Sequence, residues 1–256
     1  MNAATVGTMR AARAPAAAGA DPAWRPLYRA GGAAALLATL AYIVATVVDF
    51  TVPAAPADGG AATLDYIAGH RAVYIVEQIL WLAPSILLVV TVLALAVALR
   101  GLSQTAATIG GLLGVASWAL TLVYPATGGG APALVYLSDR YVATADAAQR
   151  AAYAAAAETF IALNIVPTAV GVLEPVGILI LSWIMLRGVF GRGVAYLGLV
   201  TGAVGIVSEA LRPVLGIAYI GYGLLLFAWL IAISWALARL ARDEGARGAI
   251  PVGRAP

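Results

Sequence analysis

Apolar residues are concentrated in six long segments of the chain, and charged residues lie almost entirely between them. The segments cover about residues 27–50, 73–99, 105–124, 160–186, 194–209 and 213–240. A helix that crosses a bilayer needs about 20 mostly apolar residues. The pattern therefore predicts an all-α, polytopic membrane protein, with six transmembrane helices in one domain over residues 27–240.

The composition indicates that most of the surface faces lipid. Of the 256 residues, 62% are hydrophobic and 11% are charged, and the mean hydropathy is +0.94. A soluble domain carries a charged fraction of about 25%. The lipid bilayer is therefore the first partner that the sequence predicts.

The arginines predict the orientation, because basic residues are enriched on the cytoplasmic side of membrane proteins. If the N-terminus is inside, eleven arginines lie in inner segments and four in outer segments. The inner ones are Arg10, Arg13, Arg25, Arg29, Arg100, Arg187, Arg192, Arg239, Arg242, Arg247 and Arg254, and the outer ones are Arg71, Arg140, Arg150 and Arg212. Both termini are therefore predicted to be cytoplasmic, with residues 1–26 a disordered tail and residues 241–256 a second tail.

The longest connection, residues 125–158, falls on the outer side. It begins with the flexible run 126–130 and ends in an Ala-rich stretch, 146–159, which we expect to form a short helix capped by Thr144. Two interpretations stay open for it. One is an interfacial helix that leads into the fourth span, and the other is a lid over an outward-facing cavity.

Three prolines fall inside the predicted spans, namely Pro84, Pro167 and Pro175. Each removes one backbone hydrogen bond and kinks its helix. The pairs Gly110/Gly114 and Gly198/Gly202 form small-xxx-small faces, which let helices approach closely in lipid. We predict that these faces make helix contacts within the protein.

Glu174 is the residue most strongly indicated for function. It lies thirteen residues from Arg187, roughly 20 Å from the inner boundary at the helical rise of about 1.5 Å per residue. A carboxyl group at that depth must face the bundle interior or water, or be neutral. It would then act as a proton carrier or bind a cation or amine. The structural alternative is a protonated side chain that donates to a carbonyl freed by Pro167 or Pro175.

Further polar residues fall in the outer halves of the spans. Glu77, Gln78 and Asn164 are predicted to line a polar pocket with Glu174. Glu209 and Arg212 are one helical turn apart and are predicted to pair at its mouth. Asp49 is interpreted as a boundary residue, and Trp81, Trp118, Trp183 and Trp229 as core packing.

The composition excludes several chemistries. The chain has no Lys and no Cys, and His70 is its only histidine. A retinal Schiff base, a thiol relay, an iron–sulfur site and bis-histidine haem ligation are therefore excluded. We find no pattern of catalytic residues, and we expect no cofactor, metal or nucleic acid. Protein partners stay open.

The basic start and the Gly/Ala-rich first span resemble those of a family of uncharacterised bacterial membrane proteins with six spans, known only as a domain of unknown function. The resemblance begins with Trp24-Arg25-Pro26-Leu27-Tyr28-Arg29-Ala30-Gly31-Gly32 and continues to residue 240. It implies the six-helix fold and a location in the bacterial plasma (inner) membrane. It implies no activity.

The leading hypothesis is therefore a multi-pass membrane protein that binds or transports a small solute or ion through an outward-facing polar pocket. The alternative is a non-catalytic scaffold, subunit or stress-related protein, in which Glu174 only stabilises a kinked helix. A membrane enzyme ranks third.

Overall fold

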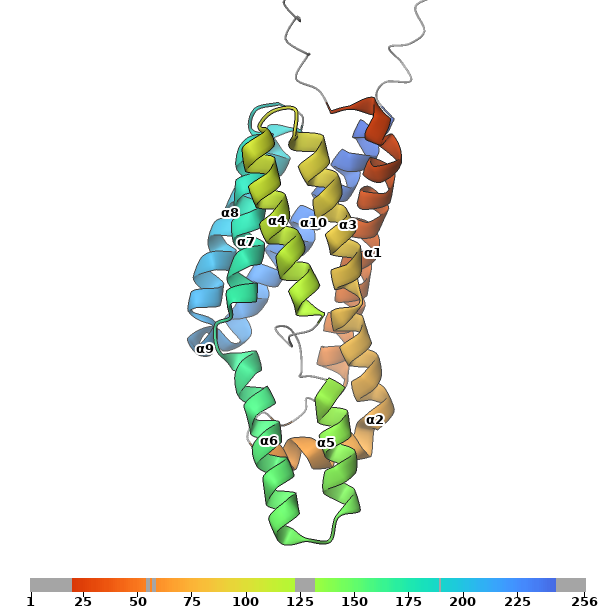
Figure 1. The fold of residues 1–256 in the computed structure, drawn as a ribbon, viewed down its shortest axis with the longest axis vertical. Helices are drawn as coiled ribbons and strands as arrows, with labels where there is room; N and C mark the ends of the chain where they lie inside the picture. Colours follow the sequence, from red (N-terminus) through yellow and green to blue (C-terminus); the bar gives the residue numbers. More distant parts are fainter. Residues whose placement is uncertain (1–19, 54–55, 57–58, 123–131, 189, 243–256) are drawn as a thin grey trace, which may run out of the picture.

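A computed structural model describes residues 20–53, 56, 59–122, 132–188 and 190–242. In this part of the chain every regular element is a helix (Figure 1). The elements are η1 (Pro22–Trp24), α1 (Arg25–Thr51), α2 (Gly60–Leu82), α3 (Pro84–Leu99), α4 (Gln104–Thr121), α5 (Pro132–Ala143), α6 (Ala147–Ile165), α7 (Ala169–Met185), α8 (Arg192–Ala210), α9 (Arg212–Leu215), η2 (Gly216–Tyr219) and α10 (Ile220–Leu240).

The helices of the main bundle form a closed ring in the order α1, α3, α4, α7, α8 and α10, each packed on the next. α1 begins, and α10 ends, at the same end of this bundle (Figure 1). We call it the terminal end, and we call the opposite end, near α9, the distal end. Tyr28, Leu99, Met185 and Leu237 are among the fully buried side chains near the terminal end.

Glycines allow α7 to sit tightly between α4 and α8. A Cβ atom on Gly177 of α7 would lie 3.0 Å from the backbone nitrogen of Gly114 in α4. A Cβ atom on Gly202 of α8 would lie 2.8 Å from the carbonyl oxygen of Pro175. The prediction that the small-residue faces make helix contacts within the protein is confirmed. The close packing fixes α7, and with it Glu174.

The helical segment that contains the second predicted span, 73–99, is longer than predicted and is divided into two helices. α2 begins at Gly60, bends at His70 (φ −126°, ψ 26°) and ends where Pro84 starts α3. Pro84 therefore begins a helix, at a position where its missing N–H costs little. The residues before the bend pack outside the main bundle. They are too polar to be predicted as part of a span.

The fourth predicted span, 160–186, is two helices. α6 ends at Ile165, and α7 begins after Thr168, whose hydroxyl oxygen accepts a hydrogen bond from the Gly171 N–H at 2.9 Å. Pro167 lies between them and ends the helix, whereas the sequence predicted a kink within one. Pro175 does lie inside α7.

The last predicted span, 213–240, is also interrupted. α9 is one turn long, and Gly216 has a positive φ of 50° at its end. Glycine adopts this conformation without the strain that a Cβ atom would add. The η2 turn and α10 follow, so Tyr219 and Tyr222 lie just after the break.

A three-helix extension projects beyond the distal end (Figure 1). It consists of residues 60–70 of α2 with α5 and α6, packed around a small core of Leu64, Ile67, Leu134 and Ala157. The Ser138 hydroxyl donates to the Leu64 carbonyl at 2.7 Å, and Arg71 pairs with Asp139. The predicted loop 125–158 therefore contains a helix, α5, that the sequence did not indicate.

The ends of that predicted loop also differ. The run 126–130 lies outside the described residues. The N-cap of α6 is Asp146, which accepts from the Ala148 N–H at 2.9 Å, and not Thr144. Of the predicted tails, 1–19 and 243–256 lie outside the described residues, while η1 and the first turn of α1 occupy 22–26.

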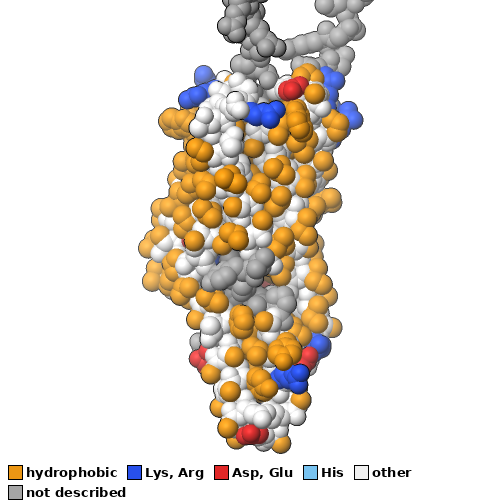
Figure 2. All heavy atoms as spheres, in the orientation of Figure 1, with side chains coloured by type: hydrophobic (Ala, Val, Ile, Leu, Met, Phe, Trp, Pro, Cys, Tyr) orange, Lys and Arg blue, Asp and Glu red, His pale blue; other side chains and the backbone are white. Residues whose placement is uncertain are grey.

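The exposed surface is typical of a helical membrane protein. By length and composition, four helical segments of the described chain are able to cross a membrane, namely 22–51, 60–99, 192–210 and 212–240, and α7 is a shorter apolar helix. Hydrophobic side chains cover the body of the bundle, and arginines gather at the terminal end (Figure 2). Large apolar side chains such as Leu37, Val47, Leu112 and Trp183 are exposed.

Candidate functional site

A cavity of about 360 Å³ lies in the distal half of the ring. Its walls come from the last turns of α1, from α2, α4 and α7, and from the chain after the α9 break. The lining residues are Tyr42, Thr46, Asp49, Phe50, Trp81, Trp118, Glu174, Ile217, Tyr219, Ile220, Tyr222, Gly223, Leu224, Leu226 and Phe227. Aromatic rings and two carboxyl groups therefore surround one space.

The aromatic wall is centred on Tyr42. Its ring centroid lies 5.5 Å from that of Trp81, 6.4 Å from that of Trp118 and 5.9 Å from that of Phe227. The Phe227 ring is stacked on it, with an interplanar angle of 13°. Offset and tilted ring pairs at these separations stabilise each other, so α1, α2, α4 and α10 meet through this cluster.

Glu174 lies at the floor of the cavity and is 9% exposed. Its Oε1 accepts a hydrogen bond from the Tyr222 hydroxyl at 3.2 Å. None of the described residues that line the cavity is basic. A buried carboxyl group with no positive partner in its cavity is costly, and this makes Glu174 the chemically unusual member of the site.

Asp49 is the second carboxyl group of the cavity and lies at its rim, where it is exposed. The Trp81 indole N–H donates to its Oδ1 at 3.4 Å. Glu77 lies near Asp49 but does not line the cavity. The rim therefore carries a carboxyl pair, of which only Asp49 faces inward.

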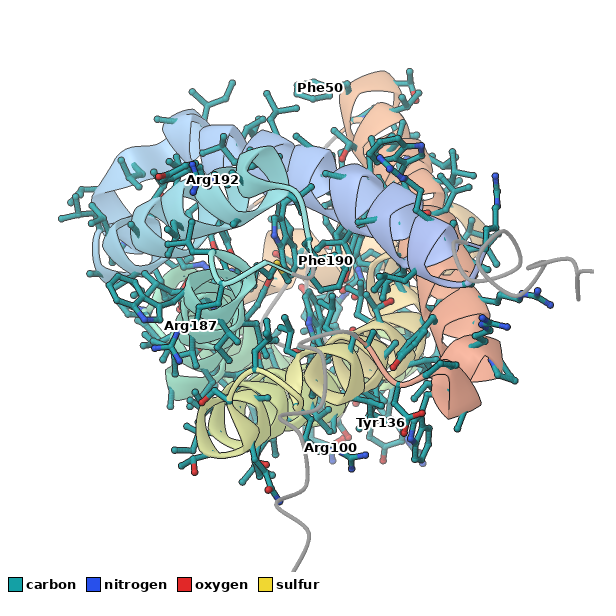
Figure 3. The ribbon with its side chains drawn as sticks, turned by 90° about the horizontal axis from the view of Figure 1, so that it is seen from above. Phe50, Arg100, Tyr136, Arg187, Phe190 and Arg192 are labelled. Atoms are coloured by element: carbon teal, nitrogen blue, oxygen red, sulfur yellow. The ribbon has the colours of Figure 1, made fainter. Side chains whose placement is uncertain are left out.

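The terminal end of the ring is filled. Phe190 is buried and lies in the middle of the ring when the bundle is viewed from that end (Figure 3). Trp229 and Leu181 are buried below it. A much smaller space of about 10 Å³, which also touches Glu174 and Trp229, is all that continues toward this end among the described pockets. Described side chains therefore occupy the ring on the terminal side of the cavity.

The most exposed residues of the cavity lining lie at the end of α1 and on the chain from η2 into α10. These helices pack closely near the terminal end, where the Ser234 hydroxyl donates to the Gly32 carbonyl at 2.7 Å. α10 then crosses obliquely toward α8 (Figure 1). Among the lining residues, Phe50 is 67% exposed, Ile217 78% and Leu224 60%. The rim is therefore apolar as well as acidic.

Glu209 occupies a separate cluster beside the cavity. Its Oε1 accepts from the Thr168 backbone N–H at 2.8 Å and pairs with Arg212 at 3.3 Å, and its Oε2 accepts from the Tyr219 hydroxyl at 3.1 Å. Thr168 is the N-cap of α7, so the carboxylate also lies at the positive end of that helix. The predicted Glu209–Arg212 pair is present.

The structure brings together only part of the predicted pocket. Glu174 lines the cavity, while Glu209 and Arg212 lie beside it and reach it through Tyr219. Glu77 lies near Asp49 and does not line the cavity. Gln78 faces a different space, lined by Ile75, Gln78, Ile79, Leu82, Ala83, Leu122 and Val135. The side chain of Asn164 lies outside the described part of the structure.

Seven of the fifteen residues that line the cavity are aromatic, and none of them was assigned to the site from the sequence. Trp81 and Trp118 were interpreted as core packing, and Tyr42, Tyr222 and Phe227 were not considered. A usable signal was present, because Tyr42, Trp118, Tyr222, Phe227 and Glu174 all lie in the distal halves of their helices. Asp49 was interpreted as a boundary residue, whereas it lines the site.

The arrangement is suited to binding. The described residues contain no group of three or more His, Asp or Glu side chains that is able to hold a metal ion. No described residue of α5 or α6 lines the cavity, so the extension does not form the cavity wall. Comparison with known proteins gave no match to a protein-family model, to a curated protein or to a solved structure.

Proposed function

We propose that this protein is a multi-pass membrane protein that binds a small solute in the cavity of its distal half. The proposed spans are α1, α2–α3, α4, α7, α8 and α9–α10, in a bacterial plasma membrane with both termini cytoplasmic. The distal end, the cavity and the three-helix extension then lie on the outer side. The partners are the lipid bilayer and the solute.

The distribution of arginines supports this orientation. Arg25, Arg29, Arg100, Arg187 and Arg192 all belong to the ends of helices at the terminal end, as do Arg239 and Arg242. The distal end of the ring has Arg212, which is paired with Glu209. Because basic residues mark the cytoplasmic side, the terminal end is the inner one.

The observation that carries the proposal is Glu174. It is buried in the membrane-spanning part of the protein, it faces a cavity of about 360 Å³, and the described residues of that cavity offer it one hydroxyl group and no positive charge. Small-molecule sites have volumes of about 300–1,000 Å³ and a few polar groups in an apolar wall. Ionisable residues within membrane spans are generally associated with function.

Single cysteines test the cavity directly, because the natural chain has none. Thr46 lines the cavity, so Thr46→Cys is expected to react with a small membrane-impermeant thiol reagent added to the outside of intact cells. Ala195→Cys is the matched control, because Ala195 is fully buried in α8 away from the cavity. It is expected to react only after unfolding.

Two further positions check the orientation. Asp139→Cys, in the extension, is expected to react from outside, and Arg187→Cys only after the membrane is permeabilised. If Asp139→Cys reacts and Thr46→Cys does not, the cavity is not reachable from the outer side and the proposed function is wrong. The reverse pattern for Asp139→Cys and Arg187→Cys would overturn the orientation.

A scaffold or subunit role is the second candidate, and the extension favours it. Tyr136 of α5 is 58% exposed and points away from the bundle (Figure 3). Val142 is exposed on the same helix. This function predicts that a protein partner copurifies in gentle detergent and is lost from Tyr136→Ala. A protein that purifies alone would contradict it.

A further inference from the structure

We infer that the solute bound in the cavity is a small lipophilic organic cation, such as an amine or a quaternary ammonium compound. The inference rests on the proposed function, because it names the ligand class of the same site. Three features support it, namely the aromatic wall, the charge of the cavity and the apolar side chains at its exposed edge.

The aromatic wall presents several electron-rich faces to one space. Trp81, Trp118 and Phe227 surround Tyr42 with centroid separations of 5.5 to 6.4 Å. Tyr222 meets Tyr219 edge to face at 5.9 Å, and the Tyr219 ring already binds a cation, because the Arg212 guanidinium lies 5.2 Å from its centroid. Trp and Tyr attract cations that lie over their ring faces, and desolvation strengthens the attraction. Groups of such rings are the known means of binding quaternary ammonium ligands.

The charge of the cavity also favours a cation. Its described lining contains Asp49 and Glu174 and no basic residue. The adjoining Glu209 shows how the protein compensates a carboxylate when the purpose is structural, because Arg212 and the α7 N-terminus face it. Glu174 has no such compensation, so a cationic ligand is the group that would supply the missing positive charge.

The wall favours an organic cation over a metal ion. Hard metal cations take six or more oxygen ligands, whereas the cavity is largely aromatic and aliphatic. The most exposed residues of the cavity lining are also apolar, namely Phe50, Ile217 and Leu224. These residues belong to the lipid-facing surface near the outer boundary. Exposed apolar side chains of this kind suit a cation that carries hydrocarbon groups.

Calorimetric titration of the full-length protein in a neutral detergent tests the ligand class. The probes are benzyltrimethylammonium and neopentylbenzene, which has the same shape with carbon in place of the charged nitrogen. We expect the cation to bind at least about tenfold more tightly than the neutral compound. Glu174→Gln and Asp49→Asn are each expected to weaken the cation by about tenfold and to leave the neutral compound unchanged.

Asp65→Asn is the matched control, because Asp65 is an exposed acid of the extension and its loss changes the net charge equally. It should bind both probes as the natural protein does. Trp81→Leu tests the aromatic wall and should weaken the cation selectively. If Glu174→Gln does not fold, binding of the two probes to Asp49→Asn, at the exposed rim, still tests the cationic ligand class.

The outcomes separate the ligand class from the function. Equal binding of the two probes, unaffected by the carboxyl variants, would overturn the cationic class and leave solute binding intact. An equal loss in Asp65→Asn would also overturn it, because the effect would then come from net charge. If neither probe binds and Thr46→Cys is unreactive, the proposed function fails as well.

Discussion

Glu174 and Glu209 lie on neighbouring helices, and both are buried, with exposed fractions of 9% and 1%. Their surroundings differ completely. Glu209 is held by the Thr168 N–H, by Arg212 and by Tyr219, whereas Glu174 accepts from Tyr222 and otherwise faces the cavity. The first carboxyl group is part of the framework, and the second is available to a ligand.

The contrast shows that burial alone does not identify a functional acid in a membrane bundle. A structural carboxylate is expected to carry its compensation with it, since an uncompensated charge in a low-dielectric interior is costly. Glu209 meets this expectation because it joins the ends of α7 and α8 to the α9 break. Glu174 does not meet it. The difference between the two residues underlies the largest and the smallest changes in stability that are predicted below.

The largest effect is expected for Glu209→Gln. The amide keeps the shape but leaves the partly buried Arg212 opposite a neutral group. Breaking a buried pair typically costs about 3–5 kcal/mol of unfolding free energy. Thermal unfolding in mild detergent measures it. Asp139→Asn is the control, because Asp139 pairs with Arg71 on an exposed surface, where a pair contributes up to about 1 kcal/mol. Equal losses in the two variants would contradict the framework role of Glu209.

An intermediate effect is expected for Gly171→Ala. A Cβ atom at Gly171 would overlap the carboxylate of Glu209, and such overpacking costs about 1–3 kcal/mol. Gly193→Ala in the first turn of α8 is the matched control, because a Cβ atom there meets nothing within 4 Å. The control should melt at or slightly above the natural temperature. A stable Gly171→Ala protein would show that the Glu209 cluster tolerates displacement.

A smaller effect is expected for Tyr222→Phe. The change removes the hydroxyl that donates to Glu174, and a single hydrogen bond of this kind contributes about 0.5–1.5 kcal/mol. Tyr196→Phe on the exposed face of α8 should leave the melting temperature unchanged. A loss in Tyr222→Phe as large as that in Glu209→Gln would place Glu174 in the framework and remove the contrast.

Much of the fold follows from the apolar segments. α1, α4 and α8 lie within a few residues of the predicted spans, because the boundary between apolar and polar residues coincides with their ends. The prediction failed where the chain forms helix outside the main bundle. Residues 60–70 and α5 are too polar for a span, and they are helical because they pack on each other.

The site was predictable only in part. The depth of Glu174 follows from counting residues, but the direction of a side chain depends on the rotation of its helix. Gln78 illustrates the limit. It is adjacent to Glu77 in sequence, but neighbouring residues of a helix point about 100° apart, and Gln78 faces another space. The aromatic wall was missed because ring contacts join four different helices.

The most direct test of the central claim is the melting temperature of Glu174→Gln, measured beside the natural protein and Glu209→Gln in the same detergent. The account predicts that Glu174→Gln melts at the natural temperature or above it, because no positive partner is left unpaired and the cost of a buried charge is removed. A fall as large as that of Glu209→Gln would contradict the account. Glu174 would then be a structural residue, and the cavity would have lost the group that defines it as a binding site.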